Sequence, residues 1–139
     1  MKDRIKAIHH VAILTDKDNY ECSKHFYTEV LGFDIILETY RKERDSYKLD
    51  LAIAGKYQIE LFSFPDFRPR GSYPEAKGLR HLAFAVDDVD AAAAELQAKG
   101  VATQAVCIDE LTQRKFVFFD DPNGQPLELY EDTPAAGVS

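Results

Sequence analysis

The sequence predicts an α+β fold in which two tandem βαβββ modules form one concave mixed sheet. Three observations predict it. The chain has 139 residues, the length of one domain; one order of strand-like and helix-like segments occurs twice; and a stretch rich in Pro and Gly separates the two copies. We assign module one to residues 5–64, the linker to 65–78, module two to 79–131 and a flexible tail to 132–139, all within a single domain.

Composition and charge narrow the classes of function. Apolar residues make up 45% of the chain and charged residues 29%, which is typical of a folded globular protein. The net charge of −7 argues against nucleic acid or an anionic membrane as the main partner. No apolar run is long enough to span a membrane and the first residues lack the apolar stretch of a secretory signal, so we expect a cytoplasmic protein. Cys22 and Cys107 lack CxxC spacing, which favours structural thiols.

Module one begins with the strand-like run Ile8–Leu14. Asp16 and Asp18 are helix-start signals and Gly32 is a stop signal, so we expect a helix between them. The side chains that share its predicted buried stripe are Cys22, Phe26, Tyr27, Val30 and Leu31. Three further strands are expected at Phe33–Tyr40, Tyr47–Ala54 and Tyr57–Phe62.

Module two repeats this order. A strand is expected at Leu79–Val86, cap signals at Asp87 and Asp88, and a helix stop at Gly100. The predicted buried stripe of this helix contains Val89, Ala92, Ala93 and Leu96. The remaining strands are expected at Val101–Ile108, Lys115–Phe119 and Pro126–Tyr130.

Strand parity places one His and one Glu of each module on the same sheet face. Because side chains alternate between the two faces of a strand, His10 lies opposite the apolar side chains of its own strand. Aligning the modules pairs His10 with His81 and Glu60 with Glu128. We expect all four to face the concave side, whereas His9 is expected at an edge or capping position.

These four side chains predict a metal site. Two imidazoles and two carboxylates at one junction would be costly to bury without a partner, and one divalent cation would accept all four: His10, Glu60, His81 and Glu128. Nitrogen and oxygen ligands without thiolate suit Ni²⁺ or Zn²⁺ first, and also Co²⁺, Mn²⁺ or Fe²⁺. Each residue alone would be interpreted as structural. The coincidence of residue type and position in both modules favours the metal site.

Four motifs resemble a known family. "HHVAI" with "FYTEVLGF", then "RHLAFAVDD" and "DPNGQPLELYE", are similar to the vicinal oxygen chelate (VOC) superfamily, which contains glyoxalases, bleomycin resistance proteins and dioxygenases. The likeness covers about residues 5–131. The stretch "YRKERDSYKLDLAIAGKYQIELFSFP" further resembles the YaeR-like, lactoylglutathione-lyase-like group. This resemblance implies the glyoxalase/VOC fold and places the family's metal ligands on His10, Glu60, His81 and Glu128.

The resemblance also implies a reaction class. Glu60 occupies a ligand position that is Glu or Gln in glyoxalase I and the epimerases, but is not acidic in extradiol dioxygenases and fosfomycin enzymes. A metal-dependent lyase or isomerase is therefore expected, in which a proton moves next to a metal-bound carbonyl of a small oxygenated substrate. Either Glu128 or Glu60 would move the proton. The alternatives are a metal-dependent dioxygenase or thiol transferase, and a non-catalytic protein that sequesters a ligand such as a drug.

Nearby cations suggest an anionic substrate. The side chains expected to flank the site and to bind a carboxylate or phosphate are Arg41, Arg44, Lys48 and Arg114. Glyoxalase I sequences tend to carry an Arg that helps to hold glutathione, and here Leu37 or Glu38 occupies that place, so the resemblance leaves open whether glutathione is used. A homodimer is the assembly that the resemblance implies.

Overall fold

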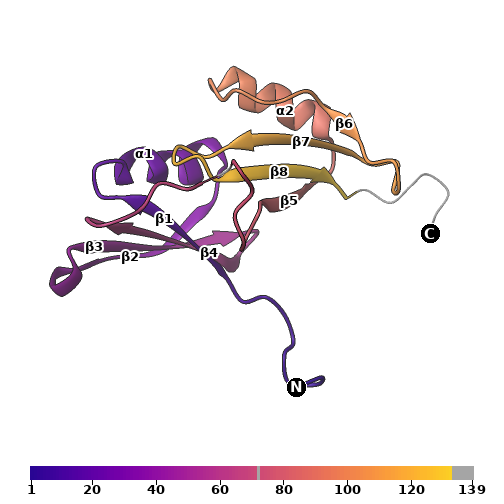
Figure 1. Ribbon diagram of the computed structural model, residues 1–139. Coiled ribbons are helices and arrows are strands. Elements are labelled where there is room, and N and C mark those ends of the chain that lie inside the picture. The colour runs from indigo at the N-terminus through magenta and orange to yellow at the C-terminus, as the bar shows by residue number, and fades with distance from the viewer. Residues whose placement is uncertain (72, 133–139) are drawn as a thin grey trace. The chain divides into compact units, whose positions relative to one another are not determined.

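The computed structural model describes residues 1–71 and 73–132, and the predicted tail beyond Asp132 lies outside the described residues. The chain divides into two compact units, Met1–Pro69 and Arg70–Ser139, and each unit is described by itself. Each contains a four-stranded mixed sheet with a helical segment after its first strand, so each unit is a βαβββ module of an α+β fold (Figure 1).

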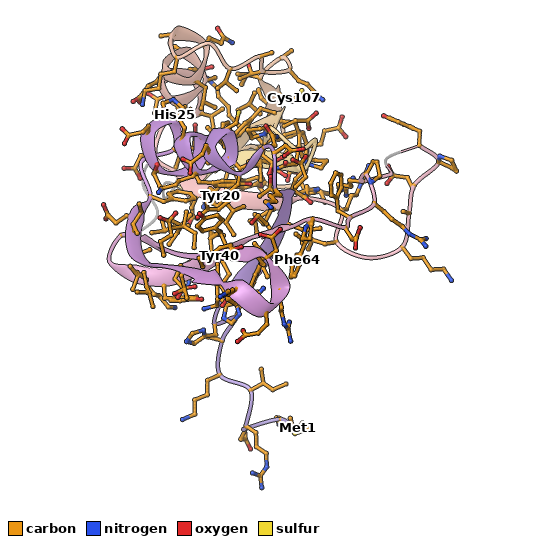
Figure 2. All side chains as sticks on the ribbon, turned by 90° about the vertical axis from the view of Figure 1, so that its left-hand side faces the viewer. Met1, Tyr20, His25, Tyr40, Phe64 and Cys107 are labelled. Atoms are coloured by element: carbon orange, nitrogen blue, oxygen red, sulfur yellow. The ribbon has the colours of Figure 1, made fainter. Side chains whose placement is uncertain are left out.

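The first unit contains four strands and a helical segment. Its elements are β1 (Val11–Asp16), α1 (Tyr20–His25), the π-helical segment η1 (Phe26–Val30), β2 (Asp34–Arg41), the 3₁₀ turn η2 (Lys42–Arg44), β3 (Ser46–Ile53) and β4 (Lys56–Phe64). The strand order is β1-β4-β3-β2, with β1 parallel to β4 and the other pairs antiparallel. The residues before β1 extend away from this sheet, with Met1 at the far end (Figure 2).

The helical segment of the first unit differs from its predicted stripe. Tyr20, Ser23, Phe26 and Tyr27 are buried, whereas Cys22 is exposed. The buried face includes Ser23 in place of Cys22, because Ser23 forms a 3.0 Å hydrogen bond with Thr15 of β1. The segment continues with π geometry from Phe26. The prediction for Cys22 is therefore wrong, and those for Phe26 and Tyr27 are confirmed.

Strand parity in the first unit matches the prediction. Val11 pairs with Ile59 and Ile13 with Leu61 in the parallel β1–β4 ladder. Ile13, Ile59 and Leu61 are buried with Leu49 and Leu51 of β3, so one face of the sheet forms the core of this unit. The opposite face carries the residues between them, among them Glu60.

The second unit repeats the arrangement. Its elements are β5 (Leu82–Val86), α2 (Val89–Ala98), β6 (Cys107–Ile108), β7 (Lys115–Asp120) and β8 (Pro126–Glu131), in the strand order β5-β8-β7-β6. The α2 helix covers one face of its sheet (Figure 1). It begins as predicted, because the Asp88 carboxylate accepts a 3.0 Å hydrogen bond from the Ala91 backbone N–H. Val89, Ala93 and Leu96 of the predicted stripe are buried.

One predicted strand is much shorter than expected. Of Val101–Ile108, the described ladder contains β6 and an isolated bridge between Thr103 and Phe119. The Val101 N–H binds the Leu96 carbonyl oxygen, so the start of this segment satisfies the end of α2 and does not enter the sheet.

The linker has the irregular structure that its composition predicts. Within the described residues, 65–71 and 73–78 contain no helix or strand. No described helix is long and apolar enough to cross a membrane.

Candidate functional site

The first unit brings His10 and Glu60 together. His10 directly precedes β1, and Ala12 pairs with Glu60 in the β1–β4 ladder. This register places the imidazole beside the carboxylate, with 2.8 Å between His10 Nε2 and Glu60 Oε2. Glu60 is buried, whereas the side chain of His10 is 37% exposed. The contact therefore links the buried carboxylate of Glu60 with the partly exposed imidazole of His10.

The second unit contains the equivalent pair. His81 directly precedes β5, and Ala83 pairs with Glu128 in the parallel β5–β8 ladder. His81 Nε2 lies 2.9 Å from Glu128 Oε2. Glu128 is buried, and the side chain of His81 is 32% exposed. Two halves of the chain thus build the same contact from the same positions of their sheets.

The surroundings of Glu60 are strongly polar. Lys48 Nζ lies 3.1 Å from Glu60 Oε1 and 2.8 Å from Asp50 Oδ1. Tyr57 donates a 2.9 Å hydrogen bond to Asp50, and the same hydroxyl also interacts with Glu60. Burial raises the pKa of Glu60, but the hydrogen bonds from Tyr57 and Lys48 and the charge of His10 outweigh burial and hold this pKa below its ordinary value.

The surroundings of Glu128 are mostly apolar. Its cross-strand neighbour is Phe118, whose ring lies edge-on to His81 with 5.1 Å between centroids. Burial raises the pKa of Glu128; His81 opposes this shift and the negative charge of Asp109 adds to it. In the part of the chain that the structure describes, no Lys or Arg forms an ion pair with Glu128.

The donor atoms in both pairs fit a divalent metal. Imidazole nitrogen and carboxylate oxygen are ligands that Ni²⁺, Zn²⁺ and Mn²⁺ accept, and a cation would compensate the burial of Glu128. Within either unit, no three described His, Cys, Asp or Glu side chains form a group that could hold a metal. Each pair offers two donor groups, and the binding of one shared ion by His10, Glu60, His81 and Glu128 stays a prediction.

Two pockets of about 410 Å³ flank the His81–Glu128 pair within the second unit. One is bordered by His81 with Arg70 and Arg80. The other is bordered by Glu128 with the aromatic side chains of Phe116 and Tyr130. The first pocket also contains the acids Glu75 and Asp120, so its charges are mixed, whereas the second combines aromatic side chains with acidic ones.

The predicted substrate-binding cations have different surroundings. Arg41 donates a 2.8 Å hydrogen bond to Ser46 and its guanidinium lies over the ring of Phe62, 4.8 Å from the centroid. Arg44 is exposed in the turn before β3, and Arg114 forms a 2.8 Å ion pair with Asp132. Their contact with a substrate stays a prediction.

The other histidines lie outside the two pairs. His9 Nδ1 is 2.8 Å from His10 Nδ1, so His9 contacts His10 from the side away from Glu60. His25 is exposed on the helical segment of the first unit, where Figure 2 labels it.

Asp50 and Tyr57 are the residues of this site that the sequence analysis missed. A signal for Asp50 is present in "YKLDLAI", because a charged residue interrupts an apolar strand two positions after Lys48. Two-residue spacing places Lys48 and Asp50 on one face, where they meet Glu60. Nothing comparable in the sequence indicates Tyr57.

Comparison with known proteins identifies the family of this chain. The family model described as "Glyoxalase/Bleomycin resistance protein/Dioxygenase superfamily" matches residues 7–129. The chain is 56% identical to YwkD of Bacillus subtilis (strain 168) over 127 residues, which cover 91% of this chain and 98% of that protein. It is 54% identical to YaeR of Escherichia coli (strain K12), with 91% and 97% covered.

A solved structure is similar throughout. The crystal structure of a glyoxalase family protein from Enterococcus faecalis matches with a TM-score of 0.83 and 45% sequence identity, covering 91% of this chain and 98% of that one. The resemblance to the YaeR-like group and the prediction of the VOC fold are both confirmed. The chain therefore belongs to the Glyoxalase/Bleomycin resistance protein/Dioxygenase superfamily, the vicinal oxygen chelate superfamily.

Proposed function

We propose that this protein is a divalent-metal-dependent lyase or isomerase that moves a proton between adjacent carbons of a small oxygenated substrate. The observation that carries the proposal is the repeated contact of an imidazole with a buried carboxylate, His10 with Glu60 and His81 with Glu128. These four side chains would hold the ion, with Ni²⁺ or Zn²⁺ expected before Co²⁺, Mn²⁺ or Fe²⁺. The bound ion would supply Lewis acidity toward the oxygens of the substrate.

Glu128 is the better candidate for the proton-transferring base. Both oxygens of Glu60 have neighbours, since Lys48 lies at Oε1 and His10 at Oε2. Among the described residues, the ion-pair partner of Glu128 is His81. A carboxylate with one neighbour can turn toward a substrate at lower cost than one held at both oxygens. The pocket beside Glu128 gives a substrate carbon room to approach it.

The proposed substrate is anionic, and the proposed assembly is a homodimer. Arg41, Arg44 and Arg114 are proposed to favour an anionic substrate, and exposed Arg44 is the most accessible of them. A cytoplasmic homodimer is proposed as the working form.

The test combines metal analysis with activity. We expect purified protein to contain a first-row divalent metal and to convert the hemithioacetal of methylglyoxal, or to epimerise an acyl-CoA, after Ni²⁺, Zn²⁺, Mn²⁺ or Fe²⁺ is restored to stripped protein. His10→Ala should lose metal, and Glu128→Gln should lose both metal and activity. His25→Ala is the matched control, because His25 is exposed and lies outside both pairs. Full metal content in His10→Ala and Glu128→Gln would contradict the site.

Ligand sequestration is a second candidate function. The aromatic side chains of Phe116, Phe118 and Tyr130 border the pocket beside Glu128, which suits a planar apolar ligand. This function predicts binding that survives metal removal and the absence of turnover with any of the substrates above.

A further inference from the structure

Two buried carboxylates face each other in the first unit. Asp50 of β3 lies directly opposite Glu60 of β4 in the antiparallel ladder, and 6% and 8% of their surfaces are exposed. Directly opposed like charges destabilise a sheet, and burial strengthens the repulsion. The arrangement therefore needs a cation between the two side chains.

Lys48 supplies that cation. It lies two residues before Asp50, on the same face of β3. Its ammonium is 2.8 and 3.1 Å from the two oxygens of Asp50 and 3.1 Å from Glu60 Oε1. Tyr57 donates a further hydrogen bond to Asp50 Oδ1. Both Asp50 oxygens are thus bound, and one Glu60 oxygen, Oε2, remains directed at His10.

The second unit shows why this arrangement is specific to the first. There Phe118 occupies the position opposite Glu128, and Phe116 lies two residues before it. No second carboxylate lies across the ladder, and no lysine is needed to separate two acids. In the second unit Asp109 lies near Glu128, but it is not across the ladder and it accepts a hydrogen bond from Tyr130. Among the described residues, the first unit is therefore the one in which a second carboxylate lies directly opposite the Glu of the pair.

We propose that Lys48 is a positioning residue that limits the ligands from the first unit to one imidazole nitrogen and one Glu60 oxygen, by holding Asp50 and Glu60 Oε1. The inference rests on the proposed metal centre. Without Lys48, Asp50 Oδ2 would be free to bind the ion while Oδ1 kept the hydrogen bond from Tyr57, and the cluster would be more negative by one charge. Because metal affinity rises with the number of charged ligands, the ion would bind more tightly and would keep fewer positions open to water or substrate.

This role differs from the substrate contact expected for Lys48 from the sequence. If Lys48 only binds an anionic substrate, its replacement would leave the affinity and hydration of the metal unchanged in the substrate-free protein. If Lys48 is a positioning residue, its replacement would change both in the absence of any substrate.

The test uses Mn²⁺ as the probe on the full-length chain without substrate. Free Mn²⁺ measured by electron paramagnetic resonance gives the Kd, and water-proton relaxation gives the number of exchangeable waters on the bound ion. In Lys48→Met we expect binding about tenfold tighter and about one water fewer than in the wild type, because Asp50 replaces a water. Lys48→Arg, which keeps the charge, should behave as the wild type, and Lys48→Met with Asp50→Asn should regain the lost water.

Lys115→Met is the matched control. Lys115 likewise lies in a sheet strand, β7, and forms an ion pair, but its partner is Asp90 of α2 at 2.5 Å. Neither the Kd for Mn²⁺ nor the number of exchangeable waters should therefore change. If Lys48→Met does not fold, Lys48→Gln gives the same comparison, since its amide retains a donor without the charge.

The outcomes separate this inference from the proposed function. Wild-type affinity and water number in Lys48→Met would overturn the role of Lys48 and leave the metal centre standing. The same is true if the Asp50→Asn change does not restore the water. A wild-type protein that binds no first-row divalent ion would overturn both.

Discussion

Glu60 and Glu128 hold equivalent positions in their sheets, yet their environments differ in charge. Glu60 shares its face with Lys48, Asp50 and Tyr57, whereas Glu128 has Phe118 across the ladder. Register fixes the direction of a side chain, but its neighbours decide its protonation and mobility. In the proposed reaction these environments suit different tasks, with Glu60 as a fixed metal ligand and Glu128 as the carboxylate that approaches the substrate.

A pH effect on stability is expected from Glu38, away from the two His–Glu pairs. Its carboxylate accepts a 2.5 Å hydrogen bond from Tyr20 and lies 2.8 Å from Lys24 Nζ. Burial raises the pKa of Glu38, but these two contacts outweigh burial and hold the pKa below its ordinary value. A carboxyl whose folded-state pKa is lowered stabilises the fold above its unfolded-state pKa, and this stabilisation is lost as the pH falls through the folded-state pKa.

We therefore expect Glu38→Gln to have a lower Tm than the wild type at neutral pH and a smaller fall in Tm between about pH 5 and pH 3. Thermal unfolding followed by circular dichroism across this range measures the difference. Glu43→Gln, at an exposed position in the η2 turn, serves as the control. Coinciding Tm curves for the wild type and Glu38→Gln would show that the Glu38 contacts do not contribute.

The residues of the candidate site could be predicted where they repeat. His10 and His81, and Glu60 and Glu128, were found because strand parity and the internal repeat are properties of the sequence alone. Asp50 and Tyr57 were missed because the position of Asp50 opposite Glu60 and the hydrogen bond from Tyr57 to Asp50 depend on cross-strand register. Register is set by the turns and by the packing of the whole sheet, so a single strand does not reveal it.

Among the elements, α2 was predicted well because its signals are local. Asp88 caps its start, and Gly100, with a φ of +85°, follows its end. The first helical segment was predicted less well, because Ser23 is buried by its contact with Thr15 on another element. The strand predicted at Val101–Ile108 is too long, because the Val101 N–H first binds the Leu96 carbonyl oxygen at the end of α2.

The N-cap of α2 is expected to contribute to the stability of the fold. Asp88→Ala removes the acceptor for the Ala91 N–H, so we expect a loss of about 1 kcal/mol in the free energy of unfolding. Asp88→Asn keeps a side-chain oxygen and should retain most of the stability. Urea unfolding measures both variants, and equal losses for Ala and Asn would show that the hydrogen bond does not carry the effect.

Across the whole chain, each unit contains half of the proposed set of metal ligands. A His and a Glu give two donor atoms, whereas stable sites for first-row divalent ions generally use three or four protein ligands. A single pair would bind such an ion weakly. The metal proposal therefore requires both units, or the units of two chains, to contribute to each ion.

This requirement predicts a non-additive response. If one ion is shared, metal at about a hundred times its Kd should raise the free energy of unfolding by about 2.7 kcal/mol. His10→Ala and His81→Ala should each abolish most of this increment, although they change different units, and the double variant should lose little more than either single variant. Denaturant unfolding with and without Zn²⁺ measures the increments, and elemental analysis should give one ion per chain. Two ions per chain, with half of the increment surviving in each single variant, would instead mean that each unit binds metal independently, because sites that share no ion contribute additively.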